Sequence, residues 1–103
     1  MLELDNSHLI KIKEFCTRWK VISFSLFGSA INNEFRADSD VDVLLDFAPD
    51  QSLNLFDYVD MREELVEIFK RSVDLVNQKV LAKSNNQIKK DEIMNNSKVI
   101  YAA

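Results

Sequence analysis

The segment LFGSAINNEFRADSDVDVLLDF, residues 26–47, contains Gly28, the only glycine of the chain, and four aspartates. Three of these aspartates fall within the five residues DSDVD, residues 38–42. A glycine directly after an apolar run lets the backbone turn and approach a ligand closely. Carboxylates at such short spacing repel one another unless they are solvated or share a cation. The segment is therefore either a solvated loop that leads into a strand or a site for a metal-bound phosphate.

The length, composition and charge describe an ordinary globular domain. A chain of 103 residues can bury one hydrophobic core, so we expect a single domain over residues 1–103. The content of 47% hydrophobic and 29% charged residues is typical of soluble globular proteins. Because binding to a phosphate backbone needs a basic face, the formal net charge of -4 argues against direct binding of nucleic acid.

The cysteine content and the N-terminus argue against secretion. Cys16 is the only cysteine, so it cannot form an internal disulfide, and we expect it to be buried on a helix. No Cys/His cluster suggests a zinc site. The start, MLELDNSHLI, has acidic residues where a signal peptide is basic, and no apolar run approaches the length of a membrane span. We therefore expect a cytoplasmic protein.

The periodicity of apolar residues predicts alternating helices and strands. Helices are expected over residues 7–20, with Asn6 or Ser7 as the cap, over residues 53–70, and from Ser84 or Asn85 to about residue 96. Strands are expected over residues 21–27, 40–47 and 72–76, and residues 98–102 are a final strand or an extended tail. Residues 29–35 are expected as a short helix or turn, and residues 77–87 as a loop. This order predicts the α/β class, with a small mixed sheet flanked by helices.

Two of these elements have a face that contributes to the core. In the strand over residues 21–27, Ile22, Phe24 and Leu26 share one side. In the helix over residues 53–70 the apolar face is broad. One stripe consists of Phe56, Val59, Val66 and Phe69, and beside it lie Tyr58, Met61, Leu65 and Ile68.

Three aspartates are candidates for a metal site. Asp40 and Asp42 are two residues apart on a predicted strand, so their side chains leave one face while Val41 and Val43 enter the core. Asp74 interrupts an apolar strand, where a carboxylate is costly unless it is solvated or paired. Carboxylate oxygens suit Mg²⁺ or Mn²⁺ rather than zinc. If the two strands are neighbours, the three acids converge and suffice to hold two metal ions for a displacement at phosphorus.

Gly28 and Ser29 are candidates for binding the phosphate. The amides after Gly28, at the start of a helix or turn, point toward an anion, and the Ser29 hydroxyl adds a donor. Phosphate donors on one side and metal ligands on the other form a site for a nucleoside triphosphate. Of the remaining acids, Asp38 is expected in the loop or as a cap. Asp46 is expected to face solvent, although it shares the alternation of Asp40 and Asp42 if the strand stays regular.

Together these motifs resemble the signature of the nucleotidyltransferase superfamily that includes DNA polymerase beta. In particular the chain is similar to the minimal nucleotidyltransferases, or MNT proteins, over LFGS, DSDVDVLLDF, SVDLV and, more loosely, DEIMNNSKVIYA. The resemblance implies a nucleotidyltransferase fold with Gly28 and Ser29 at the triphosphate. It also implies that Asp40, Asp42 and Asp74 are the catalytic residues and metal ligands, and that the third acid helps to activate the acceptor hydroxyl.

The resemblance further implies an activity and a partner. MNT antitoxins transfer AMP to a tyrosine of a HEPN toxin and thereby inactivate it, so we expect this chain to use ATP with Mg²⁺ and to bind a HEPN toxin. Arg36 matches a later arginine of the family pattern and is expected at the phosphate. Many MNT sequences have Arg-x-Arg-Gly directly after the Gly-Ser pair, where this chain has AINN, residues 30–33.

Three interpretations remain open at this stage. The first is a Mg²⁺-dependent enzyme that transfers AMP to a partner protein. The second is an antitoxin with a weak or inactive nucleotide site that neutralises its toxin by forming a complex. The absence of Arg-x-Arg-Gly favours the second interpretation, and the complete set of aspartates opposes it. The third is an α/β domain whose carboxylates are only solvated.

Overall fold

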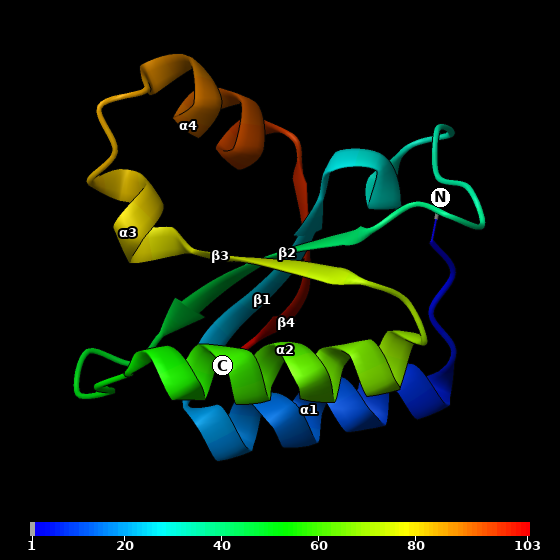
Figure 1. The fold of residues 1–103 in the computed structure, drawn as a ribbon, viewed down its shortest axis with the longest axis horizontal. Coiled ribbons are helices and arrows are strands. Elements are labelled where there is room, and N and C mark those ends of the chain that lie inside the picture. Colours follow the sequence, from blue (N-terminus) through cyan, green and yellow to red (C-terminus); the bar gives the residue numbers. More distant parts are fainter. Residues whose placement is uncertain (1) are drawn as a thin grey trace.

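A four-stranded sheet with helices on both faces forms the protein, as seen in the computed structural model, which describes residues 2–103 (Figure 1). The elements in chain order are helix α1 (Asn6–Trp19), strand β1 (Val21–Phe27), 3₁₀ helix η1 (Gly28–Ile31), strand β2 (Val41–Phe47), helix α2 (Leu55–Phe69), strand β3 (Val73–Asn77), helices α3 (Gln78–Ala82) and α4 (Gln87–Asn95), and strand β4 (Ser97–Ala102). Helices α1 and α2 lie on one face of the sheet, and α3 and α4 on the other. No helix within residues 2–103 is long and apolar enough to cross a membrane.

The sheet is mixed, which confirms the expected fold class. Its strand order is β3-β2-β1-β4. Strand β1 is antiparallel to both β2 and β4, whereas β2 and β3 are parallel and are connected by the crossover helix α2. The segment left open between a strand and an extended tail is therefore the edge strand β4. Because β2 and β3 run in the same direction, their first residues lie at the same end of the sheet.

The larger part of the core lies between the sheet and helices α1 and α2. The helices and strands around it contribute side chains that are almost fully buried: Ile12, Phe15, Cys16, Phe24, Leu26, Val41, Val43, Leu45, Met61 and Leu65. The rings of Phe15 and Phe24 meet edge to face, with centroids 6.2 Å apart. Each fully buried side chain of this size contributes about 1.5–3 kcal/mol, so this layer fixes the position of the sheet against α1 and α2.

The cap of α1 differs from the expectation. Asp5, and not Asn6 or Ser7, is the N-cap: its Oδ1 accepts a hydrogen bond from His8 N at 2.9 Å, and Asp5 N donates to His8 Nδ1 at 3.2 Å. The extended backbone of Asp5 places its carboxylate over the free amides of the first turn.

The expected face of β1 is interrupted by a β-bulge. Val21 pairs with Phe47 and Ser23 with Asp46, so Ile22 is the extra residue on β1. The bulge reverses the alternation at this point. Val21 is therefore buried, and Ile22 is 36% exposed instead of lying in line with Phe24.

Of the two stripes expected on α2, the helix buries mainly the second, which contains Met61 and Leu65. Met61, Leu65 and Phe69, at a spacing of four residues, face the core, whereas Phe56 is 78% exposed and Val59 is also exposed. The sequence offered a broad apolar face, and contact with α1 and the sheet selects only the part that includes Met61 and Leu65.

A smaller apolar cluster lies on the opposite face of the sheet. Leu44 of β2 packs with Leu81 of α3 and Ile93 of α4. The segment expected as a loop over residues 77–87 therefore contains a short helix, α3, whose N-cap Asn77 accepts a hydrogen bond from Lys79 N at 2.9 Å. This cluster holds α3 and α4 above the face of β2 that carries the aspartates.

Candidate functional site

Asp42 and Asp74 lie side by side at the start of the two parallel strands. Their Cα atoms are register partners in the β2–β3 pair. Val41 and Val43 are fully buried on the α1–α2 side, so Asp42 leaves the sheet toward α3 and α4, as the alternation predicted. Asp42 is half-buried, and Asp74, on the edge strand β3, is exposed.

The electrostatics of Asp42 reflect this arrangement. Burial raises the pKa of the Asp42 carboxyl above its ordinary value, and the negative charges of Asp74 and then Asp40 raise it further. Asp40 is exposed and lies directly before β2, so it acts on Asp42 from the loop side. The three candidate acids thus share one patch of negative potential.

The acids suit a hard divalent cation, although the side chains are not gathered into a closed cage. Within residues 2–103, no three His, Cys, Asp or Glu side chains lie close enough together to form a ready-made metal site. The repulsion that raises the pKa of Asp42 is nevertheless the interaction that a cation between Asp42 and Asp74 would reverse. Carboxylate oxygens alone, with no thiolate or imidazole in the patch, fit Mg²⁺.

Gly28 lies directly against the Asp42 carboxylate. Phe27, the residue before it, is the register partner of Asp42 across the β1–β2 pair. Gly28 has a φ of +66°, and a Cβ atom at this position would lie 2.4 Å from Asp42 Oδ2. Any side chain would therefore collide with the carboxylate. The single glycine of the chain therefore lies where the backbone packs against the acidic patch.

Ser29 follows in η1, so the Gly-Ser pair and the acids are neighbours in space. Ser29 is half-buried, and its carbonyl oxygen accepts a hydrogen bond from Asn32 N at 3.2 Å. The side-chain amide of Asn32 donates to Gly28 O at 3.3 Å. These bonds hold η1 in place, and the Ser29 hydroxyl makes no hydrogen bond with any residue of the described range 2–103.

In the part of the chain that the structure describes, the Arg36 side chain does not pair with the acids. It is exposed in the loop before β2, and within residues 2–103 its guanidinium forms no ion pair and no hydrogen bond. The loop is held instead by Arg71, which lies just before β3 and which sequence reasoning did not single out. Its guanidinium donates to the carbonyl oxygens of Arg36 and Ala37, each at 2.8 Å, and lies 4.4 Å from the centroid of the Phe35 ring. A phosphate contact by Arg36 stays a prediction.

A cavity adjoins Gly28 and Asp42. Its volume is about 550 Å³, within the range of small-molecule sites. It lies between η1 and α4 and is lined by Phe27, Gly28, Ile31, Asn32, Asp42, Lys89, Glu92, Ile93 and Asn96. The three lining residues from α4 and Asn96, which directly follows the helix, were missed in the sequence, because nothing in a single chain indicates that this polar helix returns to cover the start of β2.

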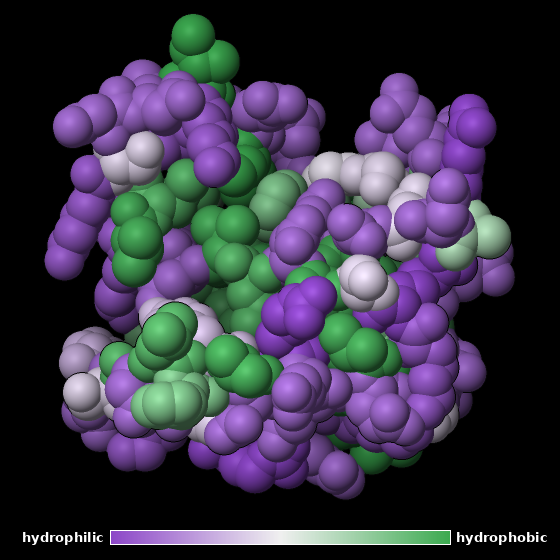
Figure 2. Space-filling view, viewed as in Figure 1, coloured by the Kyte–Doolittle hydropathy of each residue, from purple (hydrophilic) through white to green (hydrophobic). Residues whose placement is uncertain are grey.

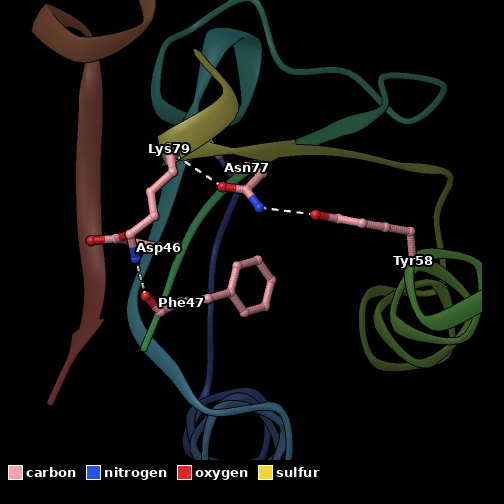
Figure 3. A network of polar contacts seen from close by, with 5 residues as sticks. All are labelled: Asp46, Phe47, Tyr58, Asn77 and Lys79. Atoms are coloured by element: carbon pink, nitrogen blue, oxygen red, sulfur yellow. Dashed lines mark hydrogen bonds and ion pairs between the residues drawn. The ribbon is translucent and has the colours of Figure 1, made fainter. Parts of the chain in front are cut away.

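Asp46 does not face solvent, which corrects the expectation for this residue. Its side chain is 21% exposed, and Oδ1 lies 3.1 Å from Lys79 Nζ (Figure 3). Lys79 also donates to the carbonyl oxygen of Phe47, while the amide of Asn77 donates to Tyr58 Oη at 2.9 Å. These contacts tie the start of α3 to β2 and α2. Asp46 therefore holds α3 in position and lies outside the group formed by Asp40, Asp42 and Asp74.

Comparisons with known proteins identify the family and the fold. The sequence profile of the nucleotidyltransferase domain matches residues 10–100. The protein adenylyltransferase MntA of Thermococcus cleftensis is 36% identical over 64 residues, which are 62% of this chain and 63% of that protein. The match therefore spans less than two thirds of that relative's length.

Solved structures show the same fold. A toxin–antitoxin complex with AMP-PNP contains a chain that superposes with a TM-score of 0.72 at 20% identity, over 92% of this chain and 73% of that one. A tri-AMPylated HEPN toxin of Shewanella oneidensis in complex with its MNT antitoxin gives a TM-score of 0.62 at 18% identity, over 93% and 71%. With a family profile that covers most of its length, the chain belongs to the nucleotidyltransferase domain family.

Proposed function

We propose that this protein is an antitoxin that transfers AMP from ATP to a tyrosine hydroxyl of a HEPN toxin in a Mg²⁺-dependent reaction. The observation that carries the proposal is the pairing of Asp42 with Asp74 across β2 and β3, directly beside the close approach of Gly28 to Asp42. Carboxylates and a glycine turn that lie together at the wall of one cavity suit a metal-bound triphosphate.

The relatives support the choice of reaction. The similar Thermococcus cleftensis protein is a protein adenylyltransferase, and one structural neighbour is the complex of an MNT antitoxin with an AMPylated HEPN toxin. The proposed reaction of this chain is a transfer of the same kind. The acceptor oxygen attacks the α-phosphorus, the bond from this phosphorus to the bridging oxygen of the β-phosphate breaks, and pyrophosphate leaves.

The residues of this chain have distinct parts in that step. Asp40, Asp42 and Asp74 would hold the divalent cation, which when bound supplies positive charge against the phosphate oxygens. Gly28 and Ser29 position the triphosphate. Asp74 is exposed on an edge strand, where an acceptor hydroxyl from another protein can reach it, and it takes up the proton that the hydroxyl loses.

The surface supports a protein as the acceptor. Leu55, Phe56 and Val59 at the start of α2 are exposed, as is Val80 of α3. Figure 2 shows apolar side chains gathered over the start of α2. Exposed apolar groups of this kind on a small protein mark a contact surface for another protein.

The test is transfer of the α-phosphoryl label of ATP to the product of the neighbouring reading frame, in the presence of Mg²⁺. We expect labelling with the wild type and its loss with Asp42→Asn. Asp38→Asn is the matched control, since it makes the same change at an exposed loop residue outside the site. Absence of label with the wild type and an active partner would overturn the proposal.

A second function is favoured by two observations. AINN, the residues 30–33 directly after Ser29, contains no cation, and within residues 2–103 no three acids form a closed metal cage. An antitoxin that neutralises its toxin by complex formation alone needs neither feature. Asp42→Asn would then still protect cells from the toxin, and no label would move with either protein.

A further inference from the structure

Helix α4 brings a lysine to the cavity that contains Gly28 and Asp42. Lys89 is the one cationic side chain among the nine residues that line this cavity. The same side chain also lines a second cavity, between α2 and α3. Lys89 therefore lies over the sheet at the junction of the two cavities, on the side of β2 that carries the acids.

The orientation of α4 follows from its packing. Asn86 caps the helix by accepting a hydrogen bond from Lys89 N at 3.0 Å. Ile93 is buried against Leu44, which is two residues from Asp42 on the same face of β2. Because residues four apart share a helix face, Lys89 is directed to the same side as Ile93. The neighbouring Lys90 points elsewhere, and its Nζ donates to Ala82 O at 3.2 Å.

The charge of the cavity favours phosphate binding by a cationic side chain. Its other charged lining side chains are Asp42 and Glu92, and both are acidic. A triphosphate brings several further negative charges into this space, and AINN, residues 30–33, supplies no cation. No ion pair with any residue of 2–103 occupies Lys89 Nζ, whereas the ammonium group of Lys79 is engaged by Asp46.

We propose that Lys89 binds the β- and γ-phosphates of ATP and takes the place of the cations that follow the Gly-Ser pair in many related sequences. This inference rests on the proposed function, because it assigns a residue to the same site. An ammonium group on a flexible stem acts as a point charge toward phosphate, so it can act from α4 across the cavity. The apolar side chains that line the cavity would then contact the nucleoside; they are Phe27, Ile31 and Ile93.

The test is binding of α,β-methylene-ATP, whose α–β linkage cannot be cleaved, and of inorganic tripolyphosphate, each with Mg²⁺, measured by calorimetry on the full chain. Lys89→Ala is expected to weaken both probes by about tenfold, because a hydrogen bond to a charged group is lost. Lys89→Arg keeps the charge and is expected to retain most of the affinity. An equal loss for both probes places the contact at phosphate rather than at the base.

The matched control is Lys83→Ala, which removes the same charge from an exposed position that lines neither cavity. It is expected to change neither affinity. If the wild type binds α,β-methylene-ATP and Lys89→Ala binds it equally well, the role of Lys89 is wrong while the proposed function stands. If the wild type binds neither probe, both the role of Lys89 and the enzymatic proposal fail. If Lys89→Ala weakens the binding of α,β-methylene-ATP but not that of tripolyphosphate, the contact of Lys89 with phosphate is also wrong.

Discussion

Asp42 Oδ2 occupies the position that a Cβ atom on Gly28 would need, since the two would lie 2.4 Å apart. The carboxylate belongs to β2, and the glycine directly follows β1, the antiparallel neighbour of β2, with Phe27 and Asp42 in register. The acid and the turn are thus mutually dependent: Asp42 can lie in this position only because residue 28 has no side chain.

Gly28→Ala is expected to destabilise the fold and to remove nucleotide binding. An alanine at a φ of +66° costs about 1–2 kcal/mol, and the collision with Asp42 adds to that cost. Chemical unfolding of the variant measures the sum. In an Asp42→Ala background the same substitution should cost less, and an equal cost in both backgrounds would show that the collision does not matter.

Asp42→Asn is expected to stabilise the protein when divalent cations are removed by EDTA. The raised pKa of Asp42 means that the folded state binds this proton more tightly than the unfolded chain does. Wild-type stability therefore declines as the pH rises through that raised pKa, and the variant lacks this part of the decline.

Thermal unfolding across the acid range, with and without Mg²⁺, measures the effect of Asp42→Asn. Mg²⁺ should raise the melting temperature of the wild type and not that of the variant. Asp38→Asn should behave like the wild type in both conditions. If Mg²⁺ leaves the melting temperature of the wild type unchanged, the proposed metal site is wrong.

Lys20→Gly is expected to stabilise the protein by about 1 kcal/mol. Lys20 ends α1 with a φ of 56°, a left-handed conformation that costs a lysine and is free for a glycine. Lys70 ends α2 in the same way, at a φ of 57°. Lys20→Ala, which removes the exposed ion pair with Asp50 but keeps a Cβ, separates the backbone effect from the charge. If Lys20→Gly is no more stable than Lys20→Ala, the left-handed backbone at residue 20 does not lower the stability of the wild type.

Lys79→Ala is expected to destabilise the fold by about 1–3 kcal/mol, because it leaves a buried carboxylate oxygen without its cation. Asp46 Oδ1 is that oxygen: it is buried and accepts no hydrogen bond, and the ammonium group of Lys79 at 3.1 Å compensates it only as an ion-pair partner. The double variant Lys79→Ala/Asp46→Ala should recover part of the loss. Urea unfolding of the single and double variants measures the coupling, and strictly additive losses would show that the pair is not coupled.

Cys16 is expected to be unreactive in the folded protein. Burial raises the pKa of its thiol to about 12, and the side chain is fully enclosed. At neutral pH the reactive thiolate is therefore almost absent. A chromogenic disulfide reagent should label the folded chain only as fast as it unfolds, and should label it at once in denaturant. Rapid labelling without denaturant would contradict the packing of α1.

Much of the fold was predictable because each element carries its own periodicity. The alternation around Asp42 places Val41 and Val43 on the opposite face, and the structure has them there. Prediction failed where two patterns of similar strength competed. The broad apolar face of α2 did not reveal that Met61 rather than Phe56 is buried, and the bulge at Ile22 cannot be seen in a strand considered alone.

The sequence by itself determined the position of the only glycine, the spacing of Asp40 and Asp42, and three of the four strands, since these depend on steric freedom and on local alternation. Only the tertiary structure decided which distant groups meet. The parallel register of β2 and β3 places Asp74 beside Asp42, and the return of α4 over the sheet brings Lys89 to the same cavity. Both contacts depend on strand pairing and helix packing between segments far apart in the chain, and local propensity carries no information about such pairings.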